Sequence, residues 1–202
     1  MRIEDVAIPI IRKVFQEKGY KFFENGQFNL NIVGIRSNNR QAGKFDDFIA
    51  VIYKNEKNEW VIRHWNATTD AGTYWLKKPM NIKGTALLVP NQFLKCWKIG
   101  LHKGKYDALV QKAPVSVYRD NNKDFILDYD SANIDTGMFG INFHSITAMA
   151  ESEVNDKWSA GCQVFANDND HKIFMQLIRK SASIFGDTFS YTLLEQSDFD
   201  NL

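Results

Sequence analysis

Two residue types that together support nucleophilic catalysis stand eighteen positions apart in this chain. His144 follows Gly140-Ile141-Asn142-Phe143, and Cys162 follows the small-residue turn 159–161. A thiol becomes a useful nucleophile at neutral pH when a nearby imidazole takes or shares its proton. Small residues before the thiol let backbone N–H groups point at a developing oxyanion. The sequence therefore predicts cysteine chemistry by a Cys162–His144 pair, with the pKa of the thiol below that of a free cysteine.

The residues around this pair resemble the signature of the L,D-transpeptidase (YkuD-type) catalytic domain over about residues 115–165. A histidine after a Gly-Ile strand is followed, at a similar spacing, by Ser159-Ala160-Gly161-Cys162. The resemblance implies that Cys162 attacks a peptide carbonyl of the peptidoglycan stem and forms an acyl-enzyme. It implies that His144 is the base, and that the backbone carbonyl of Ser145 orients its imidazole.

The resemblance also implies roles for the residues that surround the thiol. The N–H groups of Gly161 and Cys162, with Ala160, are expected to form the oxyanion hole. Thiolate, imidazole and backbone dipoles suffice for this chemistry, so neither a metal nor an organic cofactor is expected. The residues predicted to contact the substrate are Trp158, Ser159 and His102.

Two positions depart from the family pattern. Ala160 stands where the family has a second histidine, and Val164 stands where it has an arginine or asparagine. Both changes leave the nucleophile and base in place, and both alter the acceptor side of the cleft. The Trp-Ser-Ala-Gly-Cys-Gln-Val turn also resembles that of a set of phage-encoded proteins.

Apolar residues at helical spacing predict two helices. The first covers residues 4–17 and ends at Lys18-Gly19. The second covers residues 170–185, is capped by Asp168 or Asp170, and closes at Gly186.

Short β-branched and aromatic runs between turn residues predict strands in most of the remaining chain. Asn25-Gly26 favours a type I′ hairpin, and residues 55–59 are a second connection of that kind. The fold class is therefore mostly β (α+β), an L,D-transpeptidase-like sandwich or barrel with a few flanking helices, in one domain over residues 1–202. The predicted strands are 20–23, 28–35, 48–54, 60–65, 85–89, 115–118, 125–130, 138–143 and 188–194.

Composition excludes several classes of protein. The 202 residues are 44% hydrophobic and 13% aromatic, which is enough for a real core and rules out general disorder. With 25 basic and 24 acidic side chains, the chain lacks the cationic surplus of a nucleic-acid binder. No apolar run approaches the roughly 20 residues of a membrane helix. The N-terminus lacks a secretory signal, so a cytoplasmic product is expected at synthesis.

The remaining candidate residues have plainer interpretations. Cys96 lies in an apolar run and is expected to be a buried, inert thiol. His102 lies in a basic, aromatic stretch that favours a solvated loop over a contact with an acidic stem peptide. Residues 68–74 are typical of a turn between strands, and His171 lies in the first turn of a helix and needs no function.

The function that we expect is that of a cysteine peptidase acting on peptidoglycan stem peptides or cross-links. Because no signal peptide is present, a phage endolysin or virion-associated lysin is favoured, with water replacing the amine acceptor. Two alternatives remain open: a non-catalytic wall-binding or virion structural protein that retains the fold, and an L,D-transpeptidase that forms cross-links. The expected partner is peptidoglycan, with no nucleic acid and no membrane insertion.

Overall fold

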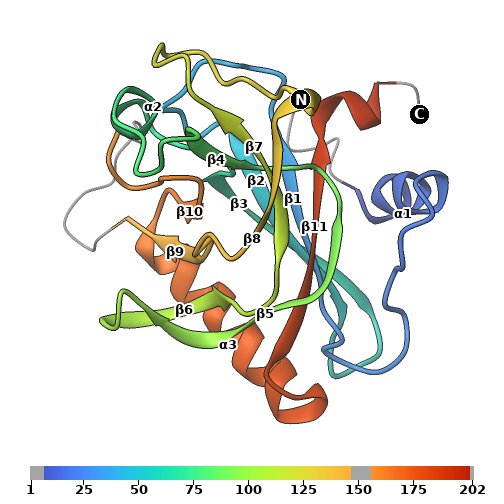
Figure 1. The fold of residues 1–202 in the computed structure, drawn as a ribbon. Coiled ribbons are helices and arrows are strands. Elements are labelled where there is room, and N and C mark those ends of the chain that lie inside the picture. The colour runs from blue at the N-terminus through green and yellow to red at the C-terminus, as the bar shows by residue number, and fades with distance from the viewer. Residues whose placement is uncertain (1–6, 147–155, 201–202) are drawn as a thin grey trace.

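Eight strands of the computed structural model close into a barrel in the order β1-β11-β5-β6-β9-β10-β3-β2 (Figure 1). The structure describes residues 7–146 and 156–200. The predicted mostly β (α+β) class is confirmed, with a closed barrel as its main sheet. The barrel strands are β1 (Asn31–Arg36), β2 (Asp47–Lys54), β3 (Trp60–Thr68), β5 (Gln92–His102), β6 (Tyr106–Gln111), β9 (Phe143–Ser145), β10 (Gln163–Phe165) and β11 (Thr188–Glu195).

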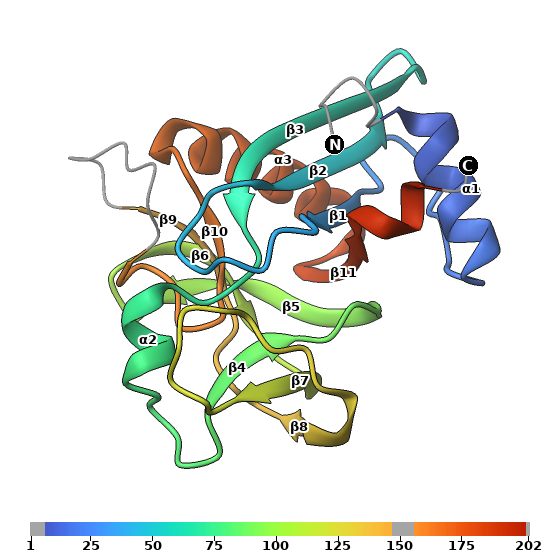
Figure 2. The same ribbon diagram turned by 90° about the horizontal axis from the view of Figure 1, so that it is seen from above.

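A second sheet of three strands stands beside the barrel. It has the order β4-β7-β8, with β4 (Thr85–Leu88), β7 (Val115–Asp120) and β8 (Ile134–Gly137). The short helix α2 (Thr73–Lys77) lies on the same side of the molecule as this sheet (Figure 2). Apolar residues of β4 and β7 belong to the same buried cluster as the barrel interior.

Aromatic side chains fill the barrel. Trp97 meets Phe143 and Tyr191 edge-on, with ring centroids 5.6 Å and 5.5 Å away. The long helix α3 (Asp168–Phe185) adds Phe174 to this core, stacked on Phe143 at 5.9 Å. Each such ring removes a large apolar area from water, and edge-to-face pairs add a specific geometry. The core therefore fixes β9, the strand that carries the candidate base, against α3.

The first helix covers the outside of the barrel. In α1 (Ile8–Glu17), Ile11, Val14 and Phe15 are buried and pack against Val33 and other residues of β1 and β2. Every residue of β1 is buried, because one face meets the barrel interior and the other meets α1. The helix ends where Lys18-Gly19 predicts, and residues 4–6 of its predicted span lie outside the described residues.

Some predicted elements are wrong. Residues 20–23 are not a strand, because Tyr20 and Phe22 turn their rings onto Phe15 of α1. Asn25-Gly26 therefore closes no hairpin. Residues 125–130 make only an isolated bridge between Gln41 and Ile126. Helix α3 is capped by Asn167 instead of Asp168 or Asp170, since its side chain accepts a hydrogen bond from the Asn169 N–H at 2.8 Å.

The β5–β6 hairpin is absent from the prediction. Lysines interrupt its alternating pattern, and Lys95 has a φ of 57° where the pairing of β5 with β11 is irregular. Such a bulge breaks the two-residue periodicity on which strand prediction depends.

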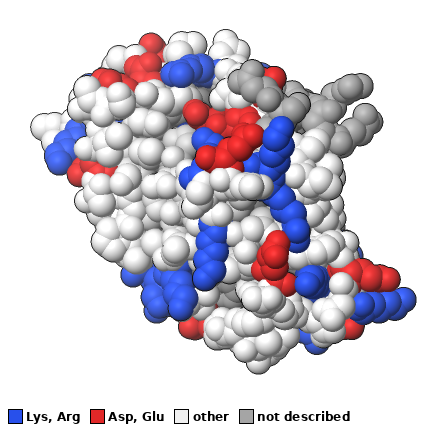
Figure 3. Space-filling view, turned by 90° about the vertical axis from the view of Figure 1, so that its right-hand side faces the viewer, with Lys and Arg blue, Asp and Glu red and all other residues white. Residues whose placement is uncertain are grey.

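Charges are mixed on the molecular face shown in Figure 3, where groups of basic side chains adjoin groups of acidic ones. Lys18 pairs with Asp198 at 2.8 Å, and Arg12 pairs with Glu24 at 3.0 Å. Within residues 7–146 and 156–200, no helix is both long enough and apolar enough to cross a membrane.

Candidate active site

The turn before Cys162 is held by the hydroxyl of Ser159. This Oγ accepts a hydrogen bond from the Gly161 N–H at 3.1 Å and donates one to the Cys162 carbonyl at 2.8 Å. The Ser159 carbonyl accepts from the Gly72 N–H at 2.8 Å, and the side chain is fully buried. Ser159 therefore shapes the turn and does not fit the expected substrate contact. Because the Gly161 N–H is already bonded, it does not fit the expected oxyanion donor.

Gly161 occupies a conformation that side chains rarely adopt, with a φ of 112°. A Cβ at this position would lie 2.1 Å from the backbone carbonyl oxygen of Ala86. The sequence correctly singles out this glycine, but the structure gives another reason for it. The constraint is the close approach of β4, in addition to any approach of a substrate.

We expect Gly161→Ala to destabilise the protein by more than the roughly 1–3 kcal/mol typical of a strained backbone conformation. The added methyl group meets the Ala86 carbonyl, which belongs to a sheet and cannot move freely. Denaturant unfolding of the variant measures the loss. Gly104→Ala is the matched control, because Gly104 has a φ of 70° but open space around it. Equal losses in the two variants would show that the contact with β4 is unimportant.

The thiol of Cys162 lies against the segment that leads into β9. Its Sγ is 3.5 Å from the Asn142 N–H nitrogen and 3.5 Å from the Gly140 carbonyl oxygen. β10 runs parallel to β9, with Gln163 paired to Phe143, and the Gln163 N–H donates to the Asn142 carbonyl at 3.0 Å. The parallel register therefore brings Cys162 beside the residue two positions before His144.

A buried glutamine organises the segment that the thiol contacts. The side-chain oxygen of Gln111 accepts hydrogen bonds from three successive N–H groups at 2.9–3.1 Å, those of Phe139, Gly140 and Ile141. Its amide nitrogen donates to the carbonyls of Ala113 and Gly137, both at 2.9 Å. These bonds hold residues 139–141 in an irregular conformation, which is why the strand predicted over 138–143 is wrong.

The imidazole of His144 is fixed in one tautomer. Its Nδ1 lies 3.0 Å from the Ser145 carbonyl oxygen, and since a carbonyl only accepts, Nδ1 carries the hydrogen. The other nitrogen, Nε2, is buried and has no hydrogen-bond partner among the described residues. The side chain is only 2% exposed. The Ser145 carbonyl thus has the position expected for it, and Nε2 is free to accept a proton.

His102 lies against His144 instead of in a solvated loop. It is the last residue of β5, it is buried, and its ring centroid is 4.1 Å from that of His144 with a tilt of 31°. Asn142 Nδ2 donates to His102 Nδ1 at 3.2 Å, while its Oδ1 accepts from the Gln111 N–H at 3.0 Å. The predicted loop and the predicted substrate contact of His102 are both at odds with this burial. His102 instead packs against the candidate base.

Tyr106 is a site residue that the sequence does not reveal. It begins β6, and its hydroxyl lies 3.4 Å from His144 Nδ1. Only the pairing of His102 with Tyr106 across the β5–β6 hairpin brings it to the base. No motif or spacing in the sequence carries that information.

A buried network of hydrogen bonds and one ion pair contacts Gln163 of β10. The Tyr191 hydroxyl donates to Gln163 Oε1 at 2.7 Å, and Gln163 Nε2 donates to the Thr69 carbonyl at 3.4 Å. Arg36 donates to the same carbonyl at 3.2 Å and pairs with Asp70 at 3.0 Å. Residues 68–70, for which the sequence predicts only a turn between strands, are therefore also part of a buried network.

Burial keeps both members of the candidate pair neutral in the free protein. It lowers the pKa of His144 to about 3, and the nearby His102 ring acts in the same direction. Burial also raises the pKa of the Cys162 thiol, against the opposing hydrogen bond from Asn142. The expectation of a lowered thiol pKa is therefore wrong. Neither the thiolate nor the imidazolium is therefore the resting form of the pair.

The structure also places Trp158, Ala160 and Cys96, the other residues discussed from the sequence. Trp158 is half-buried just before the turn, and Ala160 lines a cavity of about 260 Å³ together with Phe139 and Ala86. Cys96 is buried in the core, and burial raises its pKa, as expected of an inert thiol. The connection over residues 147–155, within the motif-bearing segment, lies outside the described residues.

His171 also belongs to this neighbourhood. It lies in the first turn of α3 and is 4% exposed, and its imidazole bonds the Phe143 carbonyl. Burial lowers its pKa to about 4. In the unfolded chain a histidine takes up a proton near pH 6.5, so acid favours unfolding between about pH 6.5 and 4. The stability that a neutral His171 provides is thus complete above pH 6.5 and falls as the pH is lowered.

We expect His171→Phe to weaken the loss of stability in acid. Between pH 7 and pH 5 one such histidine removes about 2 kcal/mol of unfolding free energy, so the variant should lose about that much less than wild type. Urea unfolding at both pH values measures the difference. The quantity compared is the change in unfolding free energy between the two pH values within each protein. Any pH-independent loss of stability caused by the substitution cancels in that difference. Parallel pH profiles would contradict a neutral, buried His171.

Comparisons with protein-family models, with curated proteins and with solved structures found no match for this chain. Across residues 7–146 and 156–200, no three His, Cys, Asp or Glu side chains converge so that they could hold a metal ion.

Proposed function

We propose that the chain is a cysteine peptidase that cleaves peptidoglycan stem peptides or cross-links through an acyl-enzyme on Cys162. One observation carries the proposal: Nδ1 of His144 is bonded to the Ser145 carbonyl, which leaves Nε2 without a partner among the described residues, while the thiol of Cys162 contacts the backbone two residues before His144. A base held in one tautomer by a backbone carbonyl, on a strand paired with the one that follows the thiol, fits the needs of nucleophilic catalysis. The resemblance of the motif to L,D-transpeptidases supplies the substrate class.

The proposed reaction uses only groups of this chain and the substrate. The thiol proton of Cys162 passes to His144 Nε2 while the sulfur bonds the substrate carbonyl carbon. The C–N bond then breaks, and the leaving amine takes the proton from the imidazolium. Water, activated by the same nitrogen, hydrolyses the thioester and releases the acid. An amine acceptor in place of water would give a cross-link instead.

A second candidate function is binding to the wall or a structural role in a virion, without catalysis. Two observations favour it: both members of the pair are neutral, and the Gly161 N–H is bonded within its own turn. Under this proposal the fold binds peptidoglycan and leaves it chemically unchanged.

Incubation with purified muropeptides in ¹⁸O-labelled water, followed by mass analysis, separates these functions. The peptidase should cleave one stem-peptide bond and place one labelled oxygen in the new carboxyl group. A transpeptidase should give a cross-linked product without the label. A binding protein should pellet with cell walls and leave every mass unchanged, and that outcome would overturn the catalytic proposal.

A further inference from the structure

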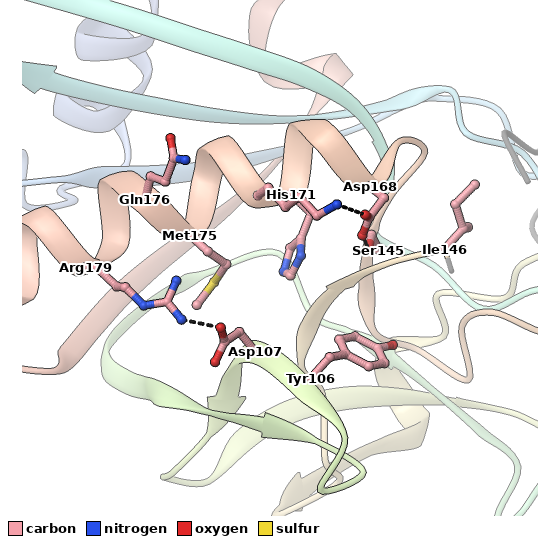
Figure 4. Close-up of a pocket in the computed structure, with 10 residues that line it drawn as sticks. Tyr106, Asp107, Ser145, Ile146, Asp168, His171, Met175, Gln176 and Arg179 are labelled. Atoms are coloured by element: carbon pink, nitrogen blue, oxygen red, sulfur yellow. Dashed lines mark hydrogen bonds and ion pairs between the residues drawn. The ribbon is translucent and has the colours of Figure 1, made fainter. Parts of the chain in front are cut away.

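A cavity of about 490 Å³ lies between α3 and the start of β6 (Figure 4). The helix contributes His171, Met175 and Arg179, which share one face because they are spaced by four residues. The strand contributes Tyr106 and Asp107. Ser145 and Tyr106, which contact His144, also line this cavity, but the role proposed above for Cys162 requires no ligand in it.

An unpartnered acceptor faces the cavity. His171 bonds the Phe143 carbonyl through one ring nitrogen, and its Nε2 is buried without a hydrogen-bond partner among the described residues. Figure 4 shows the ring pointing from α3 into the space above Tyr106. Since the bonded nitrogen carries the hydrogen, Nε2 presents a lone pair. Buried polar atoms rarely lack a partner, so this nitrogen calls for a ligand that donates.

The four charged side chains of the cavity differ in their exposure to solvent. The Asp168 carboxylate is only 24% exposed and is bonded by the Ser145 hydroxyl at 2.8 Å. Lys172, which pairs with Asp168 at 2.7 Å, is 63% exposed, and Arg179, which pairs with Asp107, is 49% exposed. Asp107 is 52% exposed, so Asp168 is the inner acceptor of the cavity, and Asp107, Lys172 and Arg179 lie at its rim.

We infer that this cavity binds a zwitterionic amino-acid centre. The ammonium group donates to His171 Nε2 and faces Asp168, and the carboxylate faces Lys172 or Arg179 at the rim. Met175, which is buried in the wall, offers an apolar surface to the side chain.

The charge balance favours a zwitterion over a singly charged ligand. The lining holds two carboxylates and two cations, paired Asp107 with Arg179 and Asp168 with Lys172. The lining therefore carries no net charge; a lone anion or cation would add one, whereas a zwitterion adds none and offers a partner to both signs. Binding here needs no chemistry at Cys162, so it can be tested apart from the proposed reaction.

Titration calorimetry with methionine, in both enantiomers, tests the inference on the full chain. At least one enantiomer should bind, and N-acetylmethionine, which lacks the ammonium group, should bind about tenfold more weakly or worse. Methioninamide, which lacks the carboxylate, should also bind more weakly. His171→Phe keeps a ring against Phe165 and should lose about tenfold in affinity.

Two controls make the outcome specific. His64→Phe changes a histidine of β3 that does not line the cavity, and Cys162→Ala removes the thiol; both should bind as wild type does. In wild-type protein, the ¹⁵N resonance of His171 Nε2 should move on addition of methionine, which covers the case that His171→Phe does not fold. Absence of binding by both enantiomers, equal binding of N-acetylmethionine, or an unmoved Nε2 resonance would overturn the inference.

Discussion

Cys162→Ala is expected to lower the rate of stem-peptide cleavage by on the order of 10⁴-fold or more, the loss typical when a catalytic nucleophile is removed. No other thiol in the described chain can replace it, because Cys96 is buried in the core. The fold should persist, since the turn is held by the Ser159 hydroxyl and backbone groups and not by the sulfur. Cleavage of muropeptides, followed by chromatography, measures the rate.

Cys96→Ala is the matched control for this prediction. It removes the other cysteine and should leave the rate per folded molecule nearly unchanged, while lowering stability by about 1–2 kcal/mol as small core truncations do. Full activity in Cys162→Ala would show that the nucleophile is misassigned.

His144→Gln is expected to cost about 10²–10⁴-fold in kcat/KM, the range typical of a general base. Glutamine can bond the Ser145 carbonyl but cannot take up a proton at neutral pH. His64→Gln provides the control on a histidine that is remote from the thiol. A variant that keeps wild-type kcat/KM would remove His144 from the mechanism.

The wild-type pH profile gives a second test of the same residue. With the pKa of His144 lowered to about 3, its neutral form persists throughout the weakly acidic range. The rate should therefore not fall as the pH is lowered from 8 through 6.5 to 5. A half-maximal rate near pH 6.5 would instead indicate an ordinary, solvated histidine.

The chemistry of the site could be predicted from sequence only where it is encoded locally. Gly161 and Cys162 are adjacent in the chain, and the tautomer of His144 depends on the next residue, so a short motif carries these features. His102, Tyr106 and Gln111 could not be predicted. They reach the site because β6, which forms a hairpin with β5, also pairs with β9, more than thirty residues further along the chain.

The elements of the fold, too, can be predicted from sequence only where a local pattern encodes them. Strands with a continuous apolar run and helices with clear ends, such as β2 and α1, lie close to their predicted bounds. The sequence does not predict the hairpin of β5 and β6, because a bulge at Lys95 breaks its periodicity. It predicts the wrong direction for the pKa of Cys162, because burial, which a sequence does not show, outweighs the hydrogen bond to its sulfur.

The central claim is that the sulfur of Cys162 carries the acyl group during turnover. Acid quenching of the protein with a stem-peptide substrate, followed by intact-mass analysis and peptide mapping, tests this most directly. The account predicts an added mass equal to the acyl part of the substrate, on the peptide that contains Cys162, labile to hydroxylamine and absent from Cys162→Ala. Substrate turnover with the acyl group on another residue, or turnover that continues in Cys162→Ala, would contradict it.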